Sequence, residues 1–325
     1  MRSPLALATA LVAVCAVACP ELAAQRARNA SARKKAAPTP FDKKELRAET
    51  EEFRQTIAMR VVPERIAKKG PREIDRWLKT FQIVQSKHYH VYTNGPTNTV
   101  KRFAKSLEEL YDFVQKTWPF EGLNTHHKAY VFATKEEYYD YCTNIVGWSR
   151  EEAVRSAGHA TGKYYATYYQ APKTSTVMHE ATHQIVIGCM KIPGVGSWFH
   201  EGTAEYIEKK ILNGKISSNM KVDLRTGNYY PFPEFVAIPS MIAGEDPHRN
   251  YTHAGCIVEF LMDVRDPRMR GKFPEFLQAA AKPGTGRSPA VTKRLFQQVY
   301  GMTLEEVDDA FFAHHGVKRK KKLRL

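Results

Sequence analysis

This chain of 325 residues has little cysteine, and what it has is not arranged in metal-binding or framework patterns. Two of its five cysteines, Cys15 and Cys19, lie in an apolar N-terminal segment, which leaves Cys142, Cys189 and Cys256. Three cysteines exclude a disulfide framework but leave open one disulfide with a free thiol. None of them lies in a pattern typical of cysteine catalysis.

Long apolar runs are also lacking. The segment Leu5 to Val17 is too short to span a bilayer comfortably. With Arg2 before it and "ELAAQ" after it, it predicts an export signal, residues 1–24, cut after Ala24. The letters "AVAC" instead resemble a lipoprotein box, which would end the signal before Cys19 and anchor the chain there by a lipid. We expect an exported protein of the periplasm, cell envelope or medium, with no transmembrane segment in the mature chain.

Acidic residues are scarce at the two ends of the chain. Residues 1–40 hold six Lys or Arg against Glu21, and residues 317–325 hold six with no acid, so the ends carry eleven of the fifteen excess positive charges. The part between them is only mildly basic, and the basic ends could hold an anionic envelope polymer or simply be solvated. We find no zinc finger, RNA-binding aromatic signature or helix-turn-helix, so no specific nucleic-acid partner is expected.

The order of patterns predicts an α+β fold. Residues 25–80 are expected to form a linker and N-terminal helices, residues 81–316 the main domain, and residues 317–325 a basic tail. Alternation predicts strands at 82–94 and 128–133 and a strand or hairpin at 159–172, and the period of 3.6 predicts helices at 99–118 and 135–145. Later helices are expected near 174–188, 197–213, 249–264, 271–281, 289–299 and 303–315. Strands early and helices late favour this α+β class.

The stretch "STVMHEATHQIVIG" carries the strongest chemical pattern. Thr174 or Ser175 is positioned to cap a helix that ends at Gly188. His179 and His183 then lie about 40° apart on one face, opposite an apolar stripe, as two ligands of a tetrahedral zinc require. Glu180 projects beside them, placed to take a proton from a metal-activated water. The alternative is two ordinary histidines on a helix.

The next predicted helix offers a third ligand. In "GVGSWFHEGTAEYIEKKIL", a glycine-rich loop leads to a helix that Ser197 can cap, and Glu201 can face the two histidines. Glu205, one turn on, is expected to accept the other ring N–H of a ligating histidine. His200 diverges from Glu201 by about 100° and is not expected to bind metal. A solvated acidic face remains the alternative for these glutamates.

The motifs "HEATHQ" and "WFHEGTAEY" together resemble the gluzincin zinc metallopeptidases, in the style of aminopeptidases and bacterial peptidase-MA-like exported proteins. The resemblance implies one Zn²⁺ per chain bound by His179, His183 and Glu201, with Glu180 as general base and acid. It also implies a zincin-like fold, with a small mixed sheet packed on the active-site helix and a helical C-terminal lobe. The absence of a G-x-M-E-N segment argues against an aminopeptidase, and Val186 and Cys189 exclude a metzincin.

A gluzincin also needs a donor for the oxyanion, and "RNYTHAGC" offers Tyr251 and His253. The resemblance favours Tyr251, although a tyrosine packed at a helix start is the alternative. The aromatic stretch "YYATYYQ" is either an edge that pairs with a peptide or core filling. The paired histidines 126–127 and 314–315 are expected at the surface or in loops.

We therefore expect an exported zinc metallopeptidase that acts on a peptide or protein substrate. The rival hypothesis is a catalytically silent, zinc-bearing module that binds envelope or wall polymers. Glu180 argues against the rival, because an inactive site has no need of a base.

Overall fold

A computed structural model describes residues 38–123, 125–171, 173–242 and 246–319. The predicted signal segment, Cys19, the linker as far as residue 37 and residues 320–325 of the basic tail lie outside this part. Within it, no helix is both long enough and apolar enough to cross a membrane. Of the predicted tail, Arg319 is described, and it forms ion pairs with Asp308 and Asp309.

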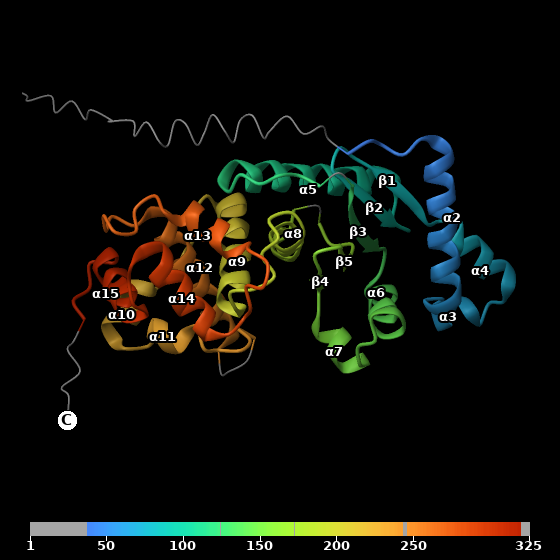
Figure 1. The fold of residues 1–325 in the computed structure, drawn as a ribbon. Coiled ribbons are helices and arrows are strands. Elements are labelled where there is room, and N and C mark those ends of the chain that lie inside the picture. The colour runs from blue at the N-terminus through green and yellow to red at the C-terminus, as the bar shows by residue number, and fades with distance from the viewer. Residues whose placement is uncertain (1–37, 124, 172, 243–245, 320–325) are drawn as a thin grey trace, which may run out of the picture. The chain divides into compact units, whose positions relative to one another are not determined.

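The β-structure is one mixed sheet of five strands in the order β1-β2-β3-β5-β4. The strands are β1 (Gln82–Gln85), β2 (Tyr89–Thr93), β3 (His127–Phe132), β4 (Gly158–Ala160) and β5 (Tyr164–Tyr168). The central pairs β2–β3 and β3–β5 are parallel, and each edge strand pairs antiparallel with its neighbour. The predicted small mixed sheet is therefore present (Figure 1).

One detail of the strand prediction is wrong. The single strand expected over 82–94 is a hairpin, because Ser86 turns the chain by pairing with the carbonyl of Tyr89. The strand or hairpin expected over 159–172 is confirmed, because β4 and β5 pair antiparallel. Of the two alternatives for the aromatic stretch, core filling holds: the stretch forms β5, which lies inside the sheet between β3 and β4 with Tyr165 fully buried, and β4 is the edge strand.

Helices cover both faces of the sheet. In the first half of the chain they are α2 (Lys43–Arg60), α3 (Glu64–Ala67), α4 (Pro71–Leu78), α5 (Thr97–Thr117), α6 (Lys135–Tyr141), the π-helix η1 (Cys142–Val146) and α7 (Arg150–Arg155). Alternation along β3 sends Ala129 and Val131 to a core shared with α5 and α8, and Tyr130 and Phe132 to a second core shared with α2 and α6. Each buried aliphatic side chain contributes about 1.5–3 kcal/mol to such a core.

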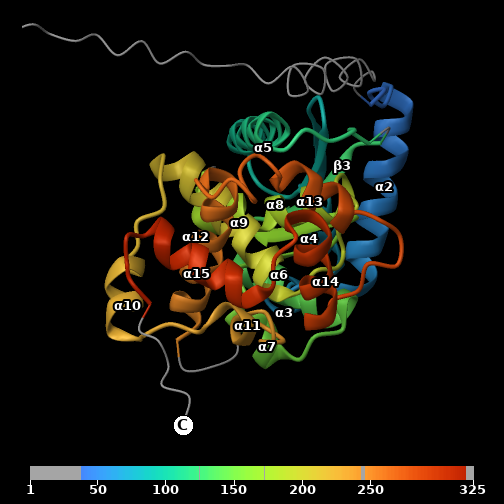
Figure 2. The same cartoon turned by 60° about the vertical axis from the view of Figure 1, so that its left-hand side comes forward.

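The second half of the chain is helical, as predicted. Its helices are α8 (Ser175–Gly188), α9 (Ser197–Asn213), α10 (Met220–Thr226), α11 (Phe232–Phe235), α12 (Pro247–Asp263), α13 (Phe273–Ala280), α14 (Pro289–Tyr300) and α15 (Leu304–His314). Figures 1 and 2 both show α9 between α8 and α12. The short helices α10 and α11 were not predicted, because a helix of one or two turns shows no apolar period.

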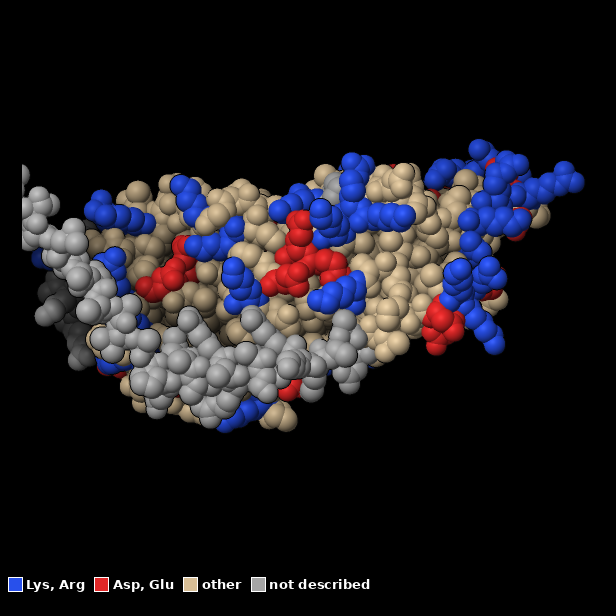
Figure 3. Space-filling model, turned by 90° about the horizontal axis from the view of Figure 1, so that it is seen from above, with Lys and Arg blue, Asp and Glu red and all other residues tan. Residues whose placement is uncertain are grey.

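Charge is mixed on one face of the molecule. On the face drawn in Figure 3, Lys and Arg lie among Asp and Glu rather than in one continuous patch. This agrees with the small excess of positive charge that the sequence gives to residues 41–316.

The three cysteines of the described part are buried and free. Burial raises the pKa of each thiol, to about 11 for Cys142 and about 12 for Cys189 and Cys256. They are therefore neutral thiols, which agrees with the expectation of no cysteine catalysis.

The prediction of a surface pair at residues 126–127 is wrong for His127. This residue begins β3 and is buried, with its Nε2 3.1 Å from the Sγ of Cys189. Burial lowers the pKa of His127 to about 4. His253 is likewise buried, and its ring centroid lies 4.2 Å from that of Phe235. Its pKa is lowered to about 3 by burial, with smaller effects from Arg249 and His315.

These two histidines predict a loss of stability in mild acid. Above the unfolded value of 6.5 both are neutral in either state, and below it only the unfolded chain takes up their protons. The free energy of unfolding should fall between pH 6.5 and about 4, by a few kcal/mol per residue at about 1.4 kcal/mol per pKa unit. Urea titrations at pH 7.5 and 5, with EDTA present throughout, would show it. His253→Gln should flatten the dependence, and equal stability at the two pH values would contradict the prediction.

Candidate metal centre

The helix α8 forms as its sequence predicts. Thr174 caps its start by accepting a hydrogen bond from the backbone N–H of Val177 at 3.3 Å. The predicted apolar stripe is fully buried and consists of Val177, Met178, Ala181 and Ile185. Packing of this stripe against the core fixes the rotation of the helix, so His179 and His183 project together from its other side, with ring centroids 4.8 Å apart.

The helix α9 starts differently from the prediction. Its N-cap is Gly196, at a φ of 116° that favours glycine, and no side chain caps it. Ser197, the predicted cap, is the first helical residue, and its Oγ accepts from the backbone N–H of Met241 at 3.0 Å. The positive φ of Gly196 allows the chain to turn directly into α9, so Ser197 is not needed as a cap.

A close approach of two helices holds α9 in place. A Cβ atom added at Gly202 would lie 2.6 Å from the carbonyl oxygen of Ala254 on α12, which only glycine avoids. Gly202 directly follows Glu201, so this contact fixes the backbone that carries the predicted third ligand. Close packing against α12 therefore explains why the residue after Glu201 is a glycine.

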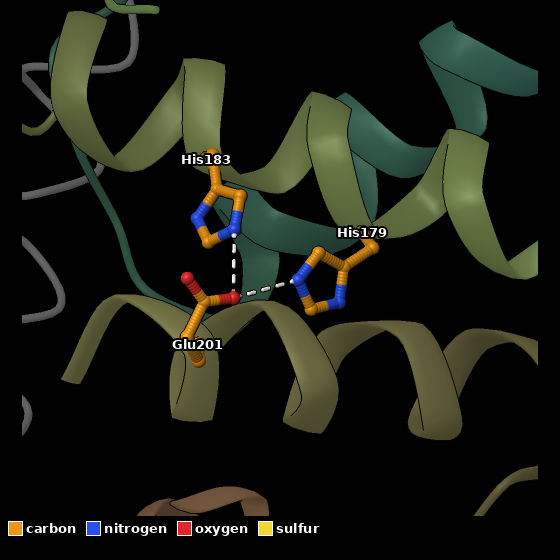
Figure 4. A group of neighbouring side chains, drawn as sticks. All are labelled: His179, His183 and Glu201. Carbon is orange, nitrogen blue, oxygen red and sulfur yellow. Dashed lines mark hydrogen bonds and ion pairs between the residues drawn. The ribbon is translucent and has the colours of Figure 1, made fainter. Parts of the chain in front are cut away.

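The two helices bring the three predicted ligands together (Figure 4). One oxygen of Glu201, Oε2, lies 3.0 Å from Nε2 of His179 and 3.2 Å from Nε2 of His183. Ser175 near the start of α8 contacts Glu208 near the end of α9, whereas His183 further along α8 contacts Glu201 near the start of α9. The helices therefore run antiparallel, as the spacing predicted.

This donor set fits zinc. Two imidazole nitrogens and one carboxylate oxygen lie within 4.8 Å of one another, and such a set leaves a fourth tetrahedral position for water or substrate. Glu201 is held as a carboxylate: although burial opposes it, hydrogen bonds from His179 and His183 hold its pKa well below the usual range. A site for a dication needs this negative charge.

His179 lies between two carboxylates, which favour the protonated form of its ring. Burial lowers its pKa, but contacts with Glu201 and Glu208 outweigh burial and raise the pKa to about 10. A metal ion bound at Nε2 would displace that proton, so metal and proton compete for the same nitrogen.

The second ring nitrogen of His179 corrects one prediction. Its Nδ1 lies 3.2 Å from Oε2 of Glu208, so Glu208 rather than Glu205 takes the predicted position. Glu208 follows Glu201 by two helical turns and returns to the side of α9 that faces α8. Glu205 turns toward α12, where a Cβ at Gly255 would lie 2.8 Å from its Cγ. The spacing of seven residues from Glu201 was the signal that could have identified Glu208.

Glu180 lies beside the ligands and under the edge strand. A Cβ added at Gly158 on β4 would lie 3.4 Å from its Cγ. Burial raises the pKa of Glu180, and the electrostatic effect of the two nearby histidines opposes the shift. A carboxylate with an elevated pKa, next to a candidate metal site, is suited to accept and return a proton.

Tyr251, the predicted oxyanion donor, also lies at the site. It belongs to the second turn of α12, and its ring centroid is 5.6 Å from that of His179. Burial and the charges of Glu201 and Glu180 raise the pKa of Tyr251, so its hydroxyl stays protonated and can donate a hydrogen bond. His253, the other residue considered for this role, packs instead between Phe235 and Phe311.

His200 was not expected to bind metal, and its ring has other contacts. Its Nε2 lies 2.9 Å from the carbonyl oxygen of Gly194. Burial lowers its pKa to about 4, so it is neutral.

Comparison with solved structures finds M1 zinc metallopeptidases of Deinococcus radiodurans. One matches at 16% identity and a TM-score of 0.38, over 74% of this chain and 52% of that chain. A mutant bound to a Tyr-Ser-Ala substrate matches at 17% identity and a TM-score of 0.40, over 74% and 51%. The chain thus spans about half the length of these structures, and at TM-scores below 0.5 no conclusion rests on the likeness. No family model and no curated protein matches the chain.

Proposed function

We propose that this chain is a zinc-dependent metallopeptidase of the gluzincin type, which binds one Zn²⁺ through His179, His183 and Glu201. The observation that carries the proposal is the meeting of both Nε2 atoms at a single carboxylate oxygen, 3.0 and 3.2 Å away, across two packed helices. Two histidines placed by chance on a helix would not have a carboxylate from another helix directed between them.

The residues around the ligands fit peptide hydrolysis. A bound Zn²⁺ supplies Lewis acidity, which acidifies a coordinated water and polarises a carbonyl group. Glu180 accepts the proton of the attacking water and returns it to the leaving nitrogen. Tyr251 donates its hydroxyl proton in a hydrogen bond to the oxygen on which negative charge develops.

The edge strand β4 gives a peptide a place to lie. It pairs on one side with β5, and its other edge is available in the described sheet. A Cβ added at Gly158 on this strand would lie 3.2 Å from Thr176 and 3.4 Å from Glu180 of α8, so an extended peptide added along β4 would pass beside the proposed base.

Metal content and metal-dependent cleavage test this proposal. The purified chain should contain about one zinc per molecule by elemental analysis. It should cleave members of a mixed peptide library, detected by mass spectrometry, and a chelator should stop cleavage until zinc, but not magnesium, is returned. A folded chain that takes up no zinc even after reconstitution would overturn the proposal.

A further inference from the structure

A network of four side chains lies behind His179, on the side away from Glu201. Glu208 is almost fully buried, and each of its oxygens has a partner. Its Oε2 faces Nδ1 of His179 at 3.2 Å. Its Oε1 accepts from the hydroxyl of Ser175 at 2.7 Å and from the ammonium of Lys209 at 2.6 Å.

Lys209 bridges two acids. Its Nζ also lies 3.4 Å from Oε1 of Glu205, which is buried as well. Ligand atoms of Glu205, Glu208 and His179 lie within 4.8 Å of one another, close enough to surround a cation. The ammonium of Lys209 is the positive charge that stands among them.

We propose that Lys209 is a positioning residue for the metal centre. It holds the carboxylate of Glu208 in place, so that this carboxylate accepts a hydrogen bond from Nδ1–H of His179. That hydrogen bond orients the ring with Nε2 toward the metal. The inference rests on the proposed function, because it requires His179 to be a ligand. Partners of a ligating histidine's other nitrogen commonly set its tautomer and ring orientation, and their loss costs about 10–100-fold in metal affinity.

An ordinary surface ion pair would not have this effect. Exposed pairs contribute about 0–1 kcal/mol, because water replaces the partner. Here the side chain of Glu208 is only 3% exposed, and that of Lys209 is 30% exposed. Removing Lys209 would leave two neighbouring buried carboxylates without their cation, so Glu208 would no longer be held toward His179.

The sign of the effect separates positioning from simple electrostatics. Lys209 is a positive charge near a site for a positive ion, so its repulsion weakens metal binding and its removal should tighten it. Positioning predicts the reverse. Lys209→Met is therefore expected to bind zinc at least about tenfold more weakly than the parent.

Zinc dissociation constants of the whole chain, measured by competition with a chromophoric chelator, give the test. Lys209→Arg keeps the charge and donors and should restore affinity to within about threefold of the parent. Lys210→Met is the matched control, because Lys210 is the next residue but pairs with Glu259 on α12 at 2.8 Å. Its affinity should equal that of the parent. The Co²⁺-substituted chain adds a readout independent of activity: its visible spectrum should change in Lys209→Met only.

Each outcome decides the inference. Unchanged or tighter zinc binding by Lys209→Met would overturn it, as would equal weakening in Lys210→Met. If Lys209→Met does not fold, Ser175→Ala removes the other hydrogen bond to the same oxygen of Glu208 and should weaken binding by about threefold or more. No change there would overturn the inference. A parent chain that binds no zinc would instead mean that the proposed function fails.

Discussion

Replacing Glu201 with alanine is expected to abolish stoichiometric zinc binding. The carboxylate is the only anionic donor among the three proposed ligands, and both ligating nitrogens lie within 3.2 Å of its Oε2. Without it, two neutral imidazoles remain, one short of the three protein ligands of a hydrolytic zinc site. The loss in affinity should exceed about 100-fold, since even substitutions outside the ligand set cost about 10–100-fold.

Elemental analysis of parent and variant, after equal exposure to zinc and the same desalting, measures this effect. The parent should retain about one zinc per chain and Glu201→Ala close to none. Glu259→Ala is a matched control, because Glu259 is an acid on the neighbouring helix α12 that pairs with Lys210. Retention of a full equivalent by Glu201→Ala would show that this carboxylate is not a ligand.

The variant should still fold. The contact between α8 and α9 rests mainly on apolar packing, with Ile185 of α8 and Ile207 of α9 fully buried in the same core. Loss of the carboxylate also leaves His179 with Glu208 as a partner. A folded, metal-free variant would therefore separate the ligand role from a structural one.

The sequence predicted most where one physical rule decides the outcome. The apolar stripe of α8 allows a single rotation of the helix against the core, and that rotation sets where His179 and His183 lie. The apolar period of 3.6 residues also predicted helices at 197–213 and 249–264, where the structure has α9 and α12. Alternation gave the strands, and the order of strands and helices along the chain gave the α+β class, whereas the mixed sheet was implied only by the resemblance to gluzincins.

Prediction failed where several local solutions were equally good. Gly196 adopts the turn that Ser197 was expected to cap, because a positive φ suffices at that point. Glu205 was chosen because it follows Glu201 by one turn, but it faces Gly255 on α12, whereas Glu208 two turns on faces His179. His127 is buried because β3 begins at that residue, one position earlier than the pattern of its neighbours suggested.

The positioning role proposed for Lys209 could not be predicted from the sequence. "EKK" on a charged helix reads as a solvated pair of lysines, and the two differ only in which acid each one meets. Lys209 contacts Glu205 and Glu208, whereas Lys210 contacts Glu259. This difference depends on the packing of three helices, which no spacing rule within one helix contains.

Replacing Glu180 with glutamine is expected to stop peptide cleavage while zinc stays bound. Glutamine has the same shape but cannot accept a proton at neutral pH, and Glu180 is not among the three grouped ligands. General base catalysis contributes about 10²–10⁴-fold to a rate, so the rate of cleavage should fall by at least about a hundredfold.

Rate and metal content must be measured on the same preparations. Glu180→Gln should retain about one zinc per chain and lose cleavage of whichever library peptide the parent cuts. Glu259→Gln, the control acid on α12, should retain both. Cleavage at the parental rate would remove Glu180 from the mechanism.

The same variant tests the rival hypothesis of a binding module. If zinc stays bound and the variant still performs the chain's cellular role, that role is binding rather than hydrolysis, and the zinc-bearing binding module replaces the peptidase. Loss of both cleavage and cellular role, with zinc and fold intact, would require chemistry at Glu180.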